Sequence, residues 1–508
     1  MAHSEDLQSL WGLVRACDAQ GNAEAAIVPL CRLAVLLPDS MAVLEALSAR
    51  CHTAQQLPFA IEAYASYLLR NPHSAIGQYN YGYLLSRAGD AAAAIVAYKK
   101  AIELQAERPE EIELNIATAY AEQLRDDVAS ERHLQQALML NPGYVPAHFN
   151  LGCLAEQQGD REKATALFSH CLALDPHYEP ALARLVDAQG FCDEQSPLLI
   201  QLRQRAATSH DPDLHFALAR ALEQCGNFSA ALTHYDFANR VDKASYEAYD
   251  ASQVVANFDA IKSCFTSDWL SKRQQGDGSA PVFICGMFRS GSTLLEQILA
   301  AHSAFTPAGE REFFARLVAK ELPDYPVGCE AISAAQVQEW AAQYQIESTR
   351  VFGPHLRLTD KRPDNFLYLG LIKALFPSAK ILVTQRAWRD IAWSIYATRF
   401  GPGQHYATDL GSIKHMIAQQ QDLMRHWQSL FPEDIHVVDY ESVVTSPRET
   451  IAAVLEFLAE PWEEACLSFS TLKNTVRTES VWQVRQPLYT SSIGRSAPFV
   501  ALCPDAFE

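Results

Sequence analysis

The N-terminal half of the chain repeats one pattern of apolar positions at helical spacing. Its clearest unit runs from Val145 to Pro176, where Ala164 and Phe168 stand four apart and so face the same side of a helix. The same pair of a small and an aromatic residue returns as Ala60 and Tyr64, Ala94 and Tyr98, and Ala231 and Tyr235. An apolar face that recurs in this way predicts a stack of similar helical units.

Turn residues and helix-ending residues mark the same period. Prolines fall at 38, 72, 109, 142 and 176, in steps of 34, 37, 33 and 34, and Gly-Asn or Gly-Asp pairs begin at 21, 89, 159 and 226. A fixed period near 34 is typical of helix-turn-helix tetratricopeptide repeat (TPR) arrays, and this half resembles TPR proteins over almost its whole length. We predict an α-solenoid of about seven units over residues 1–265, with a degenerate unit around 178–211 and a small insertion near Pro109.

The TPR resemblance implies a binding partner. Stacked repeats form a concave surface that binds a protein or peptide. The alternative is that the array only supports the next domain or dimerises. The patterns specify neither the ligand of the array nor the oligomeric state.

After a polar linker predicted at 266–280, the apolar pattern changes to a strand, a glycine-rich turn and a helix. Val282 to Cys285 is a short apolar run suited to a buried parallel strand, and Gly286 to Thr293 is the turn. The apolar positions 294, 295, 298 and 299 then have helical spacing. In this arrangement a phosphate group binds at the helix N-terminus. We therefore predict a P-loop-like α/β domain with a central parallel sheet over 281–508.

The turn lacks the lysine of nucleotide triphosphate loops. Gly286 and Gly291 are spaced as in GxxxxGK[ST], but Ser292 occupies the lysine position. That lysine holds phosphates and works with magnesium, so a kinase is disfavoured. Arg289 can supply the positive charge instead, with the hydroxyls of Ser290, Ser292 and Thr293 as donors.

Composition narrows the class of protein further. With 49% hydrophobic residues, 20% charged residues and a net charge of −19, the chain is globular and lacks the broad basic surface of a nucleic-acid-binding protein. The twelve cysteines form no CxxC pair, so we expect reduced thiols and no metal. There is no signal-peptide pattern and no run of about 18 apolar residues, so we expect a cytoplasmic protein without membrane contact.

The segment FRSGSTL, from Phe288 to Leu294, resembles the PRSGTTL-like loop of sulfotransferases that use 3′-phosphoadenosine 5′-phosphosulfate (PAPS). The likeness is to the tyrosylprotein sulfotransferase-like group, although Phe288 replaces the proline of the motif. It implies that PAPS is the co-substrate and that no metal is needed. The 5′-phosphosulfate is then expected to bind the loop residues Arg289, Ser290, Gly291, Ser292 and Thr293.

A second family element binds the 3′-phosphate of the nucleotide. It is a strand ending in arginine, with a serine eight residues later on the next helix. Here Lys380 to Gln385 leads to Arg386, and Ser394 stands at that spacing. By resemblance, Arg386 makes a bidentate contact to the phosphate and Ser394 a hydroxyl contact.

The resemblance also implies the catalytic residues. Glu310 corresponds to the base that takes the proton of the acceptor hydroxyl, with Glu312 as its rival. Other sulfotransferase branches use a histidine, but we expect His302 to cap or pack at the end of the loop helix. Lys361 matches a lysine that, together with Arg289, stabilises charge on the transferring group.

Further nucleotide contacts near the end of the chain follow from the resemblance. Tyr440 comes after a strand-like run, Ser480 is expected near the 5′-phosphate, and Arg495 is expected to cover the 3′-phosphate. Arg477, Arg485 and Tyr489 are additional candidates. Related bacterial proteins are expected to continue with a Trp/Arg/Tyr-rich helix after this point, and the tail after Arg495 lacks it. The resemblance therefore does not extend to the lid over the nucleotide.

These patterns predict transfer of a sulfuryl group from PAPS to an acceptor hydroxyl. The resemblance favours a peptide tyrosine, presented by the TPR array, and a glycan or small-molecule hydroxyl is the alternative. Two other classes remain open from the sequence. One is a P-loop kinase, and the other is a TPR interaction protein with an inactive nucleotide-binding domain.

Overall fold

A computed structural model describes residues 2–190, 193–273, 280–354 and 357–508. Its contacts divide the chain into two compact units. One unit holds the chain up to Leu154 together with Ala173–Pro176, and the other holds Ala155–Leu172 together with His177–Glu508. The later helices of the repeat region therefore belong to the same unit as the sheet described below.

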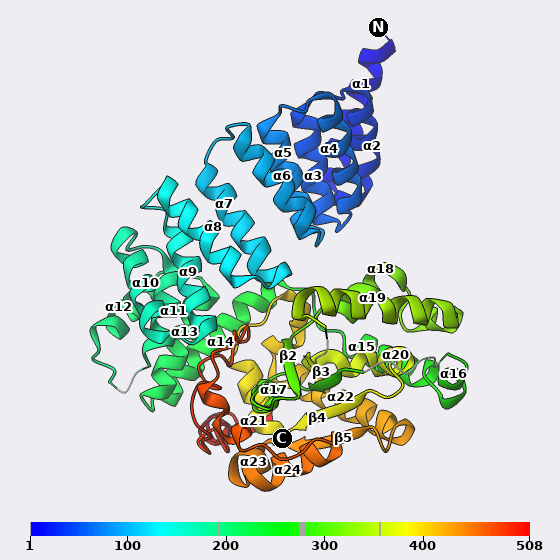
Figure 1. Cartoon of the computed structure of the whole chain (residues 1–508). Helices are drawn as coiled ribbons and strands as arrows, with labels where there is room; N and C mark the ends of the chain where they lie inside the picture. The colour runs from blue at the N-terminus through cyan, green and yellow to red at the C-terminus, as the bar shows by residue number, and fades with distance from the viewer. Residues whose placement is uncertain (1, 191–192, 274–279, 355–356) are drawn as a thin grey trace. The chain divides into compact units, whose positions relative to one another are not determined.

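The first unit is a row of helix hairpins (Figure 1). Its helices are α1 (Ala2–Ala19), α2 (Ala23–Leu36), α3 (Met41–Thr53), α4 (Leu57–Arg70), α5 (Ala75–Arg87), α6 (Ala91–Glu103), α7 (Pro109–Ala119), the π-helical η1 (Tyr120–Leu124), α8 (Asp127–Leu140) and most of α9 (Val145–Gln158). Asn22, Asp90 and Asp126 precede the second helices of three hairpins, and their side chains accept a backbone N–H of the first helical turn. Such caps satisfy amides that have no partner within the helix.

The apolar pairs that predict the repeats are packing positions. Ala94 and Tyr98 are buried on α6, and a Cβ atom on Gly82 of α5 would come within 2.8 Å of the Tyr98 ring. The prolines at 38, 72, 142 and 176 follow the second helix of a hairpin, whereas Pro109 is the first residue of α7. Proline is tolerated in a first helical turn, and its shifted place accounts for the longer 37-residue step.

The second unit continues the helical region. Its next helices are α10 (Arg161–Leu174), α11 (Glu179–Gln189), α12 (Pro197–Ala206), α13 (Pro212–Gln224), α14 (Phe228–Ser245), α15 (Ala251–Cys264) and α16 (Ser267–Ser271). Helices α11 and α12 have 11 and 10 residues, shorter than the neighbouring repeat helices, and lie where the sequence predicts the degenerate unit. The helical solenoid predicted for this half is confirmed.

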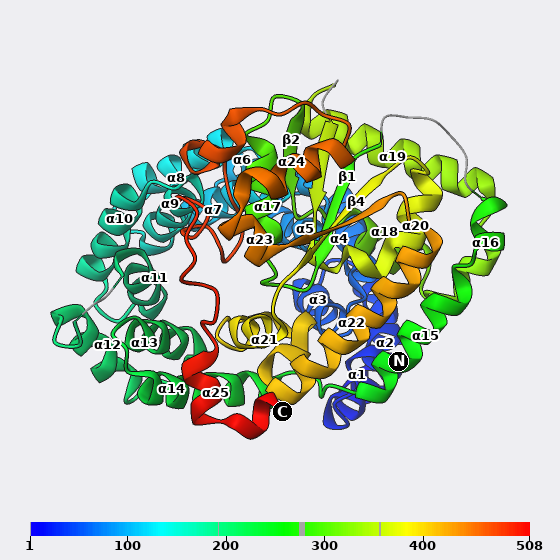
Figure 2. The same cartoon turned by 90° about the horizontal axis from the view of Figure 1, so that it is seen from below.

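A five-stranded parallel sheet forms the centre of the second unit, in the order β2-β3-β1-β4-β5. Figure 2 labels its strands β2, β1 and β4. The strands are β1 (Val282–Gly286), β2 (Phe305–Gly309), β3 (Arg357–Lys361), β4 (Lys380–Gln385) and β5 (Ile435–Asp439). Successive side chains of a strand point to opposite faces. Phe283 and Cys285 therefore enter one hydrophobic cluster and Val282 and Ile284 another, which explains a run that is apolar without alternation.

Helices cover both faces of the sheet. The helices after β1 are α17 (Ser292–Ala300), α18 (Phe313–Glu321), α19 (Ala334–Phe352), α20 (Leu369–Leu375), α21 (Trp388–Tyr396), α22 (Leu410–Leu430), α23 (Tyr440–Thr445), α24 (Pro447–Phe457) and α25 (Ala497–Leu502). Of these, α21 and α25 pack in a hydrophobic cluster with the repeat helices α13 and α14. Short 3₁₀ segments are η2 (Val327–Ala331), η3 (Pro363–Tyr368), η4 (Pro402–Thr408), η5 (Glu464–Thr471) and η6 (Pro504–Phe507). Among the described residues, no helix combines the length and the apolar character needed to cross a membrane.

Candidate functional site

The residues predicted to carry the chemistry follow the carboxyl ends of the five parallel strands. The glycine-rich loop comes after β1, Glu310 after β2 and Arg386 after β4, while Lys361 ends β3 and Tyr440 follows β5. In an open α/β sheet, these ends lie at one edge, where such folds bind their ligands. The topology thus gathers segments that are far apart in the sequence.

The loop after β1 has the backbone of an anion-binding turn. Gly286 has a φ of 147° and Gly291 a φ of 101°, and Arg289 between them lies in the left-handed region at 66°. A Cβ atom on Gly286 would lie 2.5 Å from the carbonyl oxygen of Thr384, so β4 leaves no room for a side chain there. The loop leads directly into α17, whose first amides face the turn.

Ser290 holds this loop together from inside. Its hydroxyl donates to the carbonyl of Met287 at 2.6 Å and shares a hydrogen bond of 2.6 Å with the hydroxyl of Thr384. The side chain is wholly buried. In this structure the Ser290 hydroxyl therefore holds the turn, and its role as a donor to the ligand stays a prediction.

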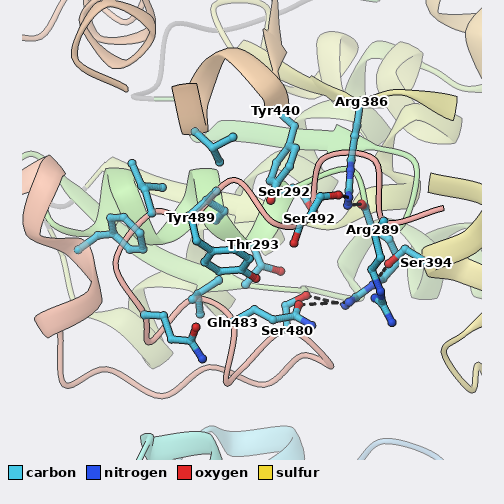
Figure 3. A pocket seen from close by; sticks show the side chains of 18 of the residues that line it. Arg289, Ser292, Thr293, Arg386, Ser394, Tyr440, Ser480, Gln483, Tyr489 and Ser492 are labelled. Atoms are coloured by element: carbon cyan, nitrogen blue, oxygen red, sulfur yellow. Dashed lines mark hydrogen bonds between the residues drawn. The ribbon is translucent and has the colours of Figure 1, made fainter. Parts of the chain in front are cut away.

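A cavity opens beside the loop (Figure 3). Of the predicted nucleotide contacts, all except Ser290 line it: Arg289, Gly291, Ser292, Thr293, Arg386, Ser394, Tyr440, Ser480 and Arg495. The structure therefore brings together residues from the loop, β4, α21, α23 and the end of the chain.

Arg289 is the central cation of the cavity. Its Nε donates to the Ser394 hydroxyl at 3.0 Å, and its Nη atoms donate to the Ser480 hydroxyl at 2.6 Å and to the amide oxygen of Gln483 at 3.2 Å. Burial, followed by repulsion from Arg495, lowers the pKa of Arg289 to about 10. A buried guanidinium whose hydrogen bonds go to neutral groups is suited to receive an anion.

Arg386 and Arg495 stand around the same cavity. Arg386 donates to the carbonyl oxygens of Arg289, at 3.3 Å, and of Ser492, and its guanidinium lies 4.6 Å from the centre of the Tyr440 ring. Its Nε is buried without a hydrogen-bond partner among the described residues. Arg495 is instead paired with Glu223 of α13.

A lysine and a carboxylate pair lies at the ends of β3 and β2. Lys361 is fully buried, and its Nζ lies 2.5 Å from Oε1 of Glu310, whose side chain is 34% exposed. The rival Glu312 is 70% exposed and lies 3.8 Å from Arg362, so it does not pair with this lysine. The lysine therefore holds a carboxylate that solvent can reach.

A second carboxylate supports this pair from α17. Glu296 is 3% exposed, and its Oε1 accepts the backbone N–H of Gly309 at 2.9 Å, directly before Glu310. Burial raises the pKa of Glu296 to about 7, against the opposing effect of the Lys361 charge. The helix that begins at the anion-binding loop is thereby tied to the strand end that carries Glu310.

Other candidates from the sequence have structural contacts. His302 packs at the end of α17, as expected, where its Nε2 lies 2.8 Å from the carbonyl oxygen of Pro461. Arg399, which follows α21 and was not a candidate, forms a bidentate pair with Asp242 and a second ion pair with Asp213. Arg485 donates to backbone carbonyls away from the cavity, including that of Leu472.

Several lining residues could not be identified from the sequence. Gln483, Gln486, Ser492, Val444, Phe469 and Leu488 also line the cavity, together with the candidate Tyr489. Most come from the stretch between Leu472 and Arg495, which contains no helix or strand. The only signal for this stretch is its likeness to a family closing loop, which does not specify single side chains of variable loops.

Known protein families match the two halves of the chain separately. Residues 281–464 match the sulfotransferase family, and residues 77–108 and 145–178 each match a tetratricopeptide repeat. These matches fall on the sheet domain and on the helix hairpins.

Two curated relatives were found. Over 378 residues the chain is 33% identical to an uncharacterized protein of Aquifex aeolicus (strain VF5), which covers 68% of this chain and 48% of that protein. Over 199 residues it is 27% identical to a protein-tyrosine sulfotransferase of Drosophila melanogaster, which covers 37% of this chain and 39% of that protein. The chain thus spans less than half the length of either relative.

Solved structures that are similar to parts of this chain include a sulfotransferase domain and a tetratricopeptide repeat protein. A sulfotransferase domain from the curacin biosynthetic pathway is 19% identical, covers 45% of this chain and 99% of that chain, and gives a TM-score of 0.29. A tetratricopeptide repeat protein from Parabacteroides merdae ATCC 43184 is 15% identical, covers 47% of this chain and 93% of that chain, and gives a TM-score of 0.36.

Proposed function

Because this chain joins a sulfotransferase-family domain to tetratricopeptide repeats, we propose that it transfers a sulfuryl group from PAPS to an acceptor hydroxyl. The observation that carries the proposal is the convergence of Arg289, Arg386 and Arg495 on one cavity at the carboxyl edge of the sheet. PAPS carries anionic groups at both its 5′ and 3′ positions. An arginine cluster with hydroxyl neighbours matches that charge distribution.

The two ends of the nucleotide would bind different parts of the cavity. The 5′-phosphosulfate would lie on the loop, with the amides at the start of α17, Arg289, and the hydroxyls of Ser292, Thr293 and Ser480. The 3′-phosphate would bind Arg386 and Ser394, with Arg495 nearby. The buried Nε of Arg386 without a partner among the described residues supports an additional acceptor at this place.

In the reaction, the acceptor oxygen attacks sulfur in line with the bond to the 5′-phosphate oxygen. That bond breaks, and adenosine 3′,5′-bisphosphate leaves. Glu310 takes the acceptor proton, while Lys361 holds its carboxylate in place and, with Arg289, stabilises charge that develops on the bridging oxygen. Positioning and charge stabilisation account for most of the catalysis in this scheme.

We propose a protein tyrosine as the acceptor, with the repeat array presenting the partner. The 27% identity to a protein-tyrosine sulfotransferase and the repeats, which bind proteins in many families, support this choice. A glycan or small-molecule hydroxyl is the alternative acceptor.

Two variants separate donor binding from chemistry. We expect Arg386→Ala to weaken adenosine 3′,5′-bisphosphate binding by about 100-fold, because a buried charged contact to the phosphate is lost. We expect Glu310→Gln to bind the bisphosphate as the wild type does, but to lose turnover by about 1,000-fold. Calorimetry measures the first effect, and release of the bisphosphate from PAPS in the presence of a tyrosine-containing peptide or a small phenol measures the second.

Arg316→Ala is the matched control, because Arg316 is 55% exposed, pairs with Glu347, and does not line the cavity. It should leave both quantities unchanged. Unchanged affinity in Arg386→Ala would reject the 3′-phosphate assignment. Full turnover in Glu310→Gln would reject Glu310 as the base.

A further inference from the structure

One wall of the cavity is a segment whose shape depends on contacts outside itself. We call residues 472–495 the closing segment; all of them are described, and none lies in a helix or strand. It contributes Ser480, Gln483, Tyr489, Ser492 and Arg495 to the cavity. An irregular segment lacks the regular backbone hydrogen bonds that fix helices and strands, so other groups must hold it.

The first half of the closing segment is anchored to the hairpin of α9 and α10. The indole N–H of Trp482 donates to Oε1 of Glu156 at 2.9 Å, and the guanidinium of Arg161 lies 4.8 Å from the centre of the Trp482 ring. The backbone N–H of Val476 donates to the carbonyl of Gln157 at 2.9 Å. These repeat residues belong to the same compact unit as the sheet.

The turn between α9 and α10 is shaped for this contact. Gly159 has a φ of 82°, and a Cβ atom there would lie 2.7 Å from Nε of Arg485. Arg485 in turn donates to the carbonyl of Gln157 at 3.4 Å and to carbonyls of the closing segment. The glycine that marks the repeat in the sequence therefore also makes room for a side chain of the enzyme domain.

The end of the closing segment is anchored to α13. Arg495 makes a bidentate ion pair with Glu223, at 2.6 and 2.9 Å. Glu223 also accepts the hydroxyl of Tyr235 on α14 at 2.8 Å, and Tyr235 is fully buried. A second glutamate of the repeat region thus holds an arginine that lines the cavity.

Neighbouring residues of the closing segment contact either the repeat hairpin or Arg289 of the cavity. Trp482 contacts the repeat hairpin, while Ser480 and Gln483 on either side of it accept hydrogen bonds from Arg289. We propose that Glu156, acting through Trp482, is a positioning residue for the nucleotide cavity, so that donor affinity depends on the repeat helices. This inference rests on the proposed donor function of the cavity.

The physical reason is the cost of ordering a loop. If the Trp482 anchor is lost, the closing segment must be ordered when the nucleotide binds, and the affinity falls by that amount. Glu156 is 5% exposed, and burial raises the pKa of its carboxyl against the opposing charge of Arg184, which lies 3.6 Å from the other carboxylate oxygen. The indole N–H of Trp482 itself needs only an acceptor oxygen. The test uses Glu156 rather than Glu223, because removing Glu223 would also take a negative charge from the rim of an anion site.

The experiment compares Glu156→Ala, Glu156→Gln, Trp482→Phe and the double variant Glu156→Ala/Trp482→Phe in the full chain. Calorimetry with adenosine 3′,5′-bisphosphate should show about tenfold weaker binding for Glu156→Ala and for Trp482→Phe. Glu156→Gln keeps an amide oxygen for the indole N–H and should bind nearly as the wild type. The double variant should be no weaker than Glu156→Ala, because that single variant has already lost the contact to Trp482.

Trp462→Phe is the matched control. In the wild type, the indole N–H of Trp462 also donates to a glutamate, Glu464, at 3.0 Å. Trp462 lies outside the closing segment and does not line the cavity. Limited trypsin digestion gives a readout that needs no nucleotide, because the closing segment contains Arg477 and Arg485. Cleavage there should be faster in Glu156→Ala and Trp482→Phe than in Trp462→Phe or the wild type.

The outcomes separate this inference from the proposed function. If the wild type binds the bisphosphate and Trp482→Phe binds it equally well, the positioning role is wrong while the donor site stands. Additive losses in the double variant would also overturn it. If the wild type does not bind the bisphosphate, the proposed donor function is wrong. In that case the trypsin digestion still tests the contact between Glu156 and Trp482, because equal cleavage in all variants would show that this contact does not hold the closing segment.

Discussion

Arg289 shows at the scale of one residue how this loop replaces the missing lysine. Its backbone is held at a φ of 66°, and its side chain reaches hydroxyl and amide groups from α21 and the closing segment. Burial and the nearby Arg495 and Arg386 lower the pKa of its guanidinium to about 10. Under the proposed function, a bound PAPS molecule would supply counter-charges, with its phosphosulfate at Arg289 and its 3′-phosphate at Arg386.

Glu296 carries a testable pH dependence of stability. Its pKa is raised from 4.5 to about 7, chiefly by burial, so between these values the folded chain binds a proton that the unfolded chain releases. The free energy of unfolding therefore falls as the pH rises through this window. Glu296→Gln keeps an acceptor for Gly309 without the charge. The free energy of unfolding of Glu296→Gln, taken relative to that of the wild type, should therefore rise by about 3 kcal/mol between pH 5 and pH 8. Urea unfolding at the two pH values measures this difference.

The exposed Glu312→Gln is the control for this measurement, since Glu312 lies at the surface. Its difference from wild type should stay constant with pH. A pH-independent difference for Glu296→Gln would show that Glu296 does not titrate with a raised pKa in the folded chain.

Where a motif fixes single residues, the sequence was enough to select side chains that line one cavity, while their roles there stay predictions. Arg289, Arg386 and Ser394 follow from the loop and from the strand-arginine-serine spacing, and they line one cavity. The inward direction of the Ser290 hydroxyl could not be predicted, because it depends on Thr384 of another strand. Gln483 and Ser492 could not be predicted either, since an irregular segment carries no periodic signal.

At the scale of elements, strands were predictable in proportion to their apolar runs. Val282 to Cys285 and Lys380 to Gln385 read as strands from the sequence, and they form the first four residues of β1 and the whole of β4. The polar β3, with sequence RLTDK, gives no such signal, yet its last four residues are buried. Its Asp360 accepts the hydroxyl of Tyr344 at 2.7 Å, a contact from the preceding helix α19 that sequence patterns cannot show.

The repeat period also makes a prediction for one helix pair. Gly82→Ala would place a Cβ atom 2.8 Å from the Tyr98 ring, between α5 and α6. We expect the free energy of unfolding to fall by about 1–3 kcal/mol, because the close approach of these helices would be lost. Chemical denaturation followed by circular dichroism measures the change.

Gly12→Ala in α1 is the matched substitution, since nothing lies within 4 Å of a Cβ atom there. It should be neutral or stabilising, because alanine has the higher helix propensity. Equal destabilisation by both substitutions would mean that Gly82 is not required for helix packing.

At the scale of the whole molecule, the repeats and the enzyme domain are linked by more than sequence order. Helix α14 holds α21, which carries Ser394, through hydrogen bonds of Asp236, Asn239 and Asp242 to residues 396 and 399. The anchors at Glu156 and Glu223 add the closing segment to this connection. The sequence predicted both halves, but it could not show that later repeat helices support the cavity, because these contacts join residues more than 150 positions apart.

The central claim is that the cavity binds the donor nucleotide, and calorimetric titration of the full chain tests it most directly. Adenosine 3′,5′-bisphosphate should bind with a Kd in the micromolar range, which is a binding free energy of about −8 kcal/mol. ATP with magnesium should bind far more weakly, because Ser292 replaces the loop lysine and ATP has no 3′-phosphate. Preference for ATP with magnesium, or binding of neither nucleotide, would contradict the account.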